Sequence, residues 1–213
     1  MPELYVAEVD YEEAGRLADL ASIYQDLSFT INVLRRLIQL LKDGSKDDTL
    51  IQSFWTAALI SYVRCFSSGK RFGLSKNIFE KLASDLEGGG IAAHQYFKDL
   101  RDKHIAHSVN PFEQIKVGLV LSEPSNPRQE VLGVSTLSQK LICVGVETVE
   151  SLLKMALIAH KQVAIFAKEY ECKTLEVGRT LPIDVLYSKP RLRIVTPAPE
   201  DAARARKCQN SAQ

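Results

Sequence analysis

Three of the four histidines of the chain lie close together, and two of them fall in the stretch LRDKHIAHS that begins at Leu100. Histidine is the side chain whose protonation changes near neutral pH, and arginine can hold two oxygens of a phosphate at once. Arg101 precedes His107 by six positions in this stretch. This combination of residue types could transfer a proton and stabilise a negative charge at one site.

The helical geometry of the stretch allows two interpretations. Six residues of an α-helix correspond to a rotation of about 600° and a rise of about 9 Å, so Arg101 and His107 project about 120° apart. The long arginine side chain can still reach the point that the histidine faces. Alternatively, a four-three spacing forms one packed seam of a helix: Ala93, Phe97, Leu100, His104 and His107. The histidines would then be packing residues, and Arg101 and Asp102 would be exposed charges.

The elements around the stretch are mostly helical. Apolar residues recur every three or four positions, which predicts five helices: 11–42, 48–66, 75–86, 91–108 and 146–170. Two β-rich runs, 115–121 and 130–137, predict a hairpin within about 113–138. The predicted fold is mainly α, an antiparallel helical bundle with a small β-hairpin insertion before the last long helix.

The domain organisation follows from where this periodicity ends. Residues 1–178 are expected to form one helical domain, followed by an extended or disordered tail over 179–213. The tail has four prolines and no periodic apolar face, and six basic residues against three acidic ones between Asp184 and Lys207. A solvated tail is expected, with contact to phosphates as the alternative.

The overall composition narrows the class of protein. A net charge of +1 argues against a broad basic surface that binds long nucleic acid through many phosphates. No apolar run approaches the roughly 20 residues that span a bilayer, and no signal-peptide pattern is present, so we expect a cytoplasmic protein without membrane contact. The four cysteines form no metal-ligand spacing, and free thiols are expected.

The motif itself resembles the signature of the HEPN superfamily. In that signature, a polar residue follows an arginine, and a histidine comes after a gap of four to six residues. Here the gap is five residues, 102–106, and Asp102 is the polar follower. Two long helices before the motif and one behind it also match. The hairpin and the LRDKxIAH wording are similar to the abortive-infection branch, over about residues 10–178.

The resemblance implies a homodimer whose two motif helices face each other, acting as a metal-independent endoribonuclease without a cofactor. By this resemblance His107 is the general acid or base, Arg101 holds the phosphate in the transition state, and Asp102 orients one of them. His104 and Lys103 are auxiliary candidates, and His104 could equally pack at an interface. The branch implies a defence or toxin-like effector on RNA, with which an antitoxin or regulatory protein could associate.

A second patch lies at the end of the second predicted helix. Tyr62, Arg64, Lys70 and Arg71 combine aromatic and basic side chains that could bind substrate. Cations at a helix C-terminus are also common because they suit the helix dipole, so this patch has a structural alternative.

Two alternatives to the ribonuclease remain. His104 and His107 could bind zinc with His94 or Asp99, but no HExxH arrangement and no clear third ligand are present, so no metal site is expected. The chain could also be a non-catalytic helical dimer that acts as a protein or nucleotide interaction module. The near-neutral charge favours the module, and the presence of both Arg101 and His107 favours the nuclease.

Overall fold

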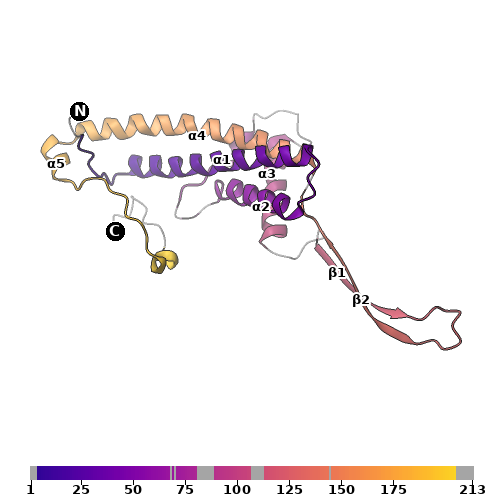
Figure 1. Cartoon of the computed structure of the whole chain (residues 1–213). Coiled ribbons are helices and arrows are strands. Elements are labelled where there is room, and N and C mark those ends of the chain that lie inside the picture. The colour runs from indigo at the N-terminus through magenta and orange to yellow at the C-terminus, as the bar shows by residue number, and fades with distance from the viewer. Residues whose placement is uncertain are drawn as a thin grey trace.

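The computed structural model describes residues 4–67, 69, 71–80, 89–106, 113–143 and 145–204. Two long helices, α1 (Glu12–Lys42) and α4 (Val146–Thr180), lie side by side along the body, and α2 (Asp48–Arg64) packs against α1 (Figure 1). The predicted mainly helical chain with a small antiparallel hairpin is confirmed.

Polar contacts at both ends fix α1 and α4 as antiparallel neighbours. Near the end of α1, Lys42 Nζ lies 2.7 Å from Glu150 Oε1 in the first turns of α4. Before the start of α1, the Tyr11 hydroxyl donates to the carbonyl oxygen of Thr174 at 2.7 Å, near the end of α4. The start of one helix therefore lies beside the end of the other.

The turn between α1 and α2 follows from its local sequence. Gly44 adopts a φ of 68°, in the left-handed region that glycine enters without strain, and this ends α1. The Asp47 carboxylate then accepts a hydrogen bond from the Leu50 N–H at 2.9 Å and caps α2. Because the connection is short, α2 folds back along α1.

The core forms between the apolar stripes of these three helices. Each stripe follows the predicted three-and-four spacing, and burial of one large aliphatic side chain contributes about 1.5–3 kcal/mol. The fully buried members include Leu20, Ile23, Leu27, Leu34, Leu37, Trp55, Leu59, Leu152, Met155 and Val163.

The region before the motif is less regular than the periodicity predicted. Of the helix predicted over 75–86, the described part forms a 3-10 turn at Lys76–Phe79, and residues 81–88 lie outside the described residues. The helix predicted over 91–108 begins as α3 (Gly89–Asp99) and continues as a π-helical segment, Leu100–Ile105.

The hairpin consists of β1 (Glu113–Leu121) and β2 (Val131–Lys140). The two strands are antiparallel, with Glu113 opposite Lys140 and Val117 opposite Thr136. Figure 1 shows the hairpin extending away from the helical body as an arm.

The end of the chain differs from the predicted tail. α4 continues to Thr180 instead of ending near residue 170, and α5 (Ile183–Ser188) follows. The Leu192 N–H donates to the carbonyl oxygen of Val6 at 2.9 Å, so this segment pairs with the N-terminal residues. The predicted boundary at residue 178 therefore falls inside a helix. No helix in the described part of the chain has the length and apolar character needed to cross a membrane.

Candidate functional site

The motif residues lie on the π-helical segment Leu100–Ile105, which follows α3 without a break. The N–H of Ala106 donates to the carbonyl oxygen of Arg101 at 3.0 Å, a bond between residues five apart. This wider turn is rare, and single π-helical turns inside α-helices are frequent at functional sites. The motif therefore starts where the backbone departs from regular α-helix.

Arg101 and Asp102 form an ion pair on this segment. Arg101 Nη1 lies 2.9 Å from Asp102 Oδ1, and the two side chains are 28% and 38% exposed. A guanidinium has five N–H donors, so the pair leaves donors that can contact a phosphate. The carboxylate contacts the arginine directly, and the orienting role of Asp102 stays a prediction.

His104 occupies the opposite, inner side of the segment. Only 9% of the residue is exposed, and its Nε2 atom lies 3.3 Å from the carbonyl oxygen of Leu141, just after β2. Phe97 and Leu100 are also buried, so these three residues pack within the protomer, as the packing interpretation predicts. His104 thereby joins the motif to the base of the hairpin.

Of the other predicted site residues, Lys103 is described by the structure, but His107 and Lys70 are not. Lys103 is on the surface, with its Nζ atom 3.8 Å from Asp99 Oδ1 one turn earlier. His107, the predicted general acid or base, and Lys70 of the predicted substrate patch lie outside the described residues.

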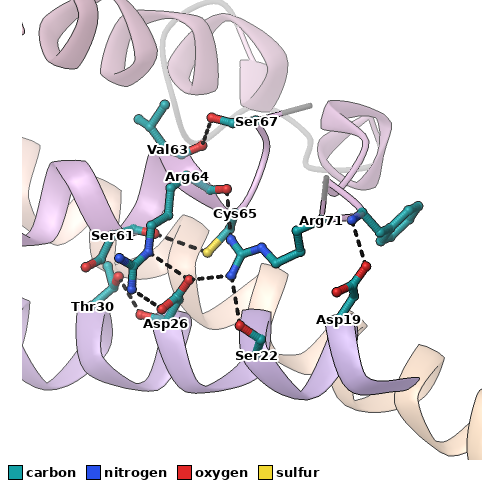
Figure 2. Close-up of polar contacts among 11 residues, drawn as sticks. Asp19, Ser22, Asp26, Thr30, Ser61, Val63, Arg64, Cys65, Ser67 and Arg71 are labelled. Atoms are coloured by element: carbon teal, nitrogen blue, oxygen red, sulfur yellow. Dashed lines mark hydrogen bonds and ion pairs between the residues drawn. The ribbon is translucent and has the colours of Figure 1, made fainter. Parts of the chain in front are cut away.

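The two described arginines of the predicted substrate patch converge on one carboxylate. Arg64 and Arg71 each donate to Asp26 on α1, through Arg64 Nε and Arg71 Nη1, both 2.8 Å from Oδ2 (Figure 2). Arg64 Nη2 also contacts Asp26 Oδ1. Arg71 further donates to Ser22 Oγ and to the backbone carbonyl of Arg64, both at 3.0 Å.

This network has a structural role and a residual charge. Burial alone would raise the pKa of Asp26, but hydrogen bonds and charge from Arg64 and Arg71 outweigh it and hold that pKa below its usual value. The network ties α1 to the end of α2. Two guanidiniums against one carboxylate leave one positive charge, and the Arg64 side chain is 55% exposed.

Tyr62 does not belong to that surface patch, contrary to the sequence prediction. The residue is fully buried, and its hydroxyl lies 3.0 Å from His94 Nδ1. The rings of Phe66 and Phe79 surround the histidine, with centroids 4.4 Å and 5.6 Å from its own. Burial, with smaller effects of Lys98 and Lys76, lowers the pKa of His94 to about 4. His94 and Tyr62 are therefore neutral core residues.

A cavity of about 220 Å³ lies beside the motif, between α2, the π-helical segment and the base of the hairpin. We call it the hairpin-base cavity. Besides two isoleucines, its lining side chains are Gln52, Trp55, Thr56, His104, Glu113 and Lys140. Lys140 Nζ lies 3.5 Å from Glu113 Oε1, so an ion pair joins the two strands at this wall.

The sequence analysis did not predict this cavity, although some of its lining residues form a recognisable arrangement in the sequence. Gln52 and Thr56 are polar residues one turn apart, on either side of the large aromatic Trp55. Glu113 and Lys140 stand at the two ends of the hairpin with opposite charges. A larger cavity of about 700 Å³ lies at the other end of α4, beside α5, and contains none of the motif residues.

The described residues contain no group of three or more His, Cys, Asp or Glu side chains that could hold a metal ion. Comparisons with protein-family models, with curated proteins and with solved structures find no significant match to this chain.

Proposed function

We propose that this protein is a metal-independent endoribonuclease of the HEPN type. The observation that carries the proposal is the Arg101–Asp102 pair, a partly exposed guanidinium restricted by a carboxylate on a π-helical turn. Further support comes from the order of the elements, since two antiparallel helices precede the motif and the long helix α4 follows it. The sequence of the motif supplies His107 six positions after Arg101.

The proposed reaction is attack of the ribose 2′-oxygen on the adjacent phosphorus. His107 accepts the 2′-hydroxyl proton or protonates the departing 5′-oxygen, and its counterpart in the second copy does the other step. Arg101 stabilises the negative charge that develops on the phosphate oxygens. The bond from phosphorus to the 5′-oxygen breaks, and the products carry a 2′,3′-cyclic phosphate and a 5′-hydroxyl.

The reaction requires a homodimer that brings two motif segments to one cleft. Because Phe97, Leu100 and His104 are buried within the protomer, the apolar seam of the motif is not the contact surface. The outer side of the segment, which carries Arg101, faces the second copy instead. By its resemblance to the abortive-infection branch, the dimer acts on cytoplasmic RNA as a defence or toxin-like effector, controlled by an antitoxin or regulatory protein.

A cleavage assay on purified protein tests the ribonuclease. Wild-type protein should cut single-stranded RNA equally well with and without a chelator, and mass spectrometry should find 2′,3′-cyclic phosphate ends. Arg101→Ala should slow cutting by about 10²- to 10³-fold, and the matched control Arg36→Ala, at an exposed arginine of α1, should cut like wild type. If dimeric wild-type protein leaves a varied RNA panel intact with and without divalent metals, the proposal fails.

The exposed hairpin favours a second candidate, a non-catalytic helical dimer that acts as an interaction module. Alternation along the paired strands puts Ile115, Val117, Leu119 and Val134 on one face of the ribbon. These side chains are 64–76% exposed, which is unusual for so many adjacent apolar residues. A second copy, related by a twofold axis, would cover this face with its own identical face.

A further inference from the structure

The only tryptophan of the chain, Trp55, lies in the wall of the hairpin-base cavity. The residue is 1% exposed, and its indole Nε1–H has no hydrogen-bond partner among the described residues. Buried donors in native proteins nearly always have an acceptor, and an unpaired one costs as much as a lost hydrogen bond. A ligand that brings an acceptor into this cavity would remove that cost.

The other walls indicate what kind of ligand fits. Gln52 and Thr56 lie one turn apart on α2, and the glutamine amide and the threonine hydroxyl can each donate and accept hydrogen bonds. The charges of Glu113 and Lys140 are paired with each other at 3.5 Å, so the cavity has no large excess of either sign. Its isoleucines, Ile105 and Ile142, offer apolar surface. These walls suit a neutral, flat molecule with donors and acceptors on its edge.

A nucleobase has this chemistry. Proteins read unstacked bases of single-stranded RNA through hydrogen bonds to the base edge and apolar or aromatic contacts to its face. A glutamine amide can form two such bonds to one base. The cavity volume of about 220 Å³ corresponds to roughly seven water molecules at about 30 Å³ each, which is room for one base and not for a whole nucleotide.

The position of the cavity relates it to the motif. His104 lies three residues after Arg101 and also forms part of the cavity wall. Because the cavity wall includes His104 and Ile105, a base held there would lie against the same π-helical segment that carries Arg101. We propose that the hairpin-base cavity is a base-binding subsite for single-stranded RNA, with Gln52 and Thr56 as the residues that select the base. The choice of RNA as ligand rests on the proposed function.

The lone tryptophan provides the test. A ¹H–¹⁵N spectrum contains one indole N–H signal, which belongs to Trp55. We expect this signal to shift and saturate on titration with at least one of the 3′-monophosphates of uridine, cytidine, adenosine and guanosine. Inorganic phosphate and ribose 5-phosphate, which lack a base, should leave it in place. Saturation by phosphate alone, or no shift with any nucleotide, would overturn the proposal.

Variants that keep the tryptophan locate the ligand. Gln52→Ala and Thr56→Val should each weaken nucleotide binding about 10-fold, the effect of losing one hydrogen bond. The matched control Gln39→Ala, on the exposed side of α1, should bind like wild type, and circular dichroism should show all three folded. A saturating shift with unchanged affinity in both cavity variants would place the ligand elsewhere and overturn the subsite.

The same titration on Arg101→Ala separates the subsite from the proposed reaction. Base binding needs no cleavage, so the indole signal should still shift and saturate in this variant, even where loss of the Arg101 contact to the phosphate weakens the affinity. If nucleotides shift the signal but wild-type protein cuts no RNA, the ribonuclease fails and the subsite stands. If RNA is cut but no nucleotide shifts the signal, the subsite fails and the ribonuclease stands.

Discussion

The hydroxyl of Tyr62 on α2 and the Nδ1 atom of His94 on α3 lie 3.0 Å apart in the core, where they connect the two helices. Both side chains are almost completely buried, and aromatic rings surround the histidine. Because a charged imidazolium would lose its hydration there, the buried ring stays neutral well below its usual pKa. The contact therefore links the stability of the fold to pH.

We predict that the free energy of unfolding falls as the pH drops from about 6.5 to about 4. In the unfolded chain His94 titrates with its ordinary pKa near 6.5, but in the folded protein its pKa is about 4. Between these values only the unfolded state takes up the proton, so the folded state loses up to about 3 kcal/mol. Urea unfolding at several pH values measures this effect.

The variant His94→Gln, which lacks the titrating imidazole, is the control for this pH effect. It should be less stable at pH 7 but should lose less stability between pH 6.5 and 4 than wild type. A smaller loss should remain, because burial also lowers the pKa of His160. Parallel pH profiles for the two proteins would contradict the assignment to His94.

A second prediction concerns the carboxylate that holds two arginines. Asp26→Asn should destabilise the fold by about 2–3 kcal/mol, because Arg64 and Arg71 would keep their partly buried charges without a counter-ion. The matched control is Asp10→Asn, whose carboxylate is exposed and 3.5 Å from Lys189, and it should change stability by no more than about 0.5 kcal/mol. Denaturant unfolding at pH 7 compares them, and equal effects would show that the network is not structural.

The parts of the fold that depend on local pattern were predictable. The bounds of α1 and α2, and the start of α4, follow from apolar spacing and from turn residues such as Gly44. The ion-pair network around Asp26 could not be predicted from the sequence. Arg64 lies 38 positions away from Asp26, and their pairing depends on how α1 and α2 pack. Tyr62 was misassigned for the same reason, since its position beside Arg64 did not reveal that it faces His94.

In the candidate site, too, the local sequence pattern was predictable and the three-dimensional arrangement was not. Arg101, Asp102 and His104 were recognised from their order, but no apolar spacing or turn residue indicated the π-helical turn that separates the partly exposed arginine from the buried histidine. The pairing of residues 6 and 192 was likewise beyond any local pattern, because the partners are at opposite ends of the chain.

A third prediction tests the hairpin as a contact between copies. Val134→Lys places a charge on the apolar face of the ribbon. In the interaction-module candidate, where the copies meet through the hairpin, it should convert the dimer to monomer at tens of micromolar protein, whereas a dimer formed through the outer side of the motif segment should persist. Ser135→Lys adds the same charge on the opposite face and should leave the dimer intact, since neighbouring residues of a strand point to opposite sides. Light scattering distinguishes the two. A monomeric wild-type protein at this concentration would count against the dimer and against the ribonuclease that requires it.

The last prediction ranks the residues of the motif by their effect on the reaction. Arg101→Ala removes positive charge from the transition state, and such losses lower the rate of the chemical step by about 10²- to 10³-fold. Asp102→Asn keeps the shape of the side chain and one hydrogen bond to the arginine 2.9 Å away, so it should slow cleavage by no more than about 10-fold. Single-turnover cleavage rates at saturating protein measure both, and circular dichroism should show that both variants are folded. A loss in Asp102→Asn as large as in Arg101→Ala would mean that the carboxylate takes part in proton transfer instead of orienting its neighbour.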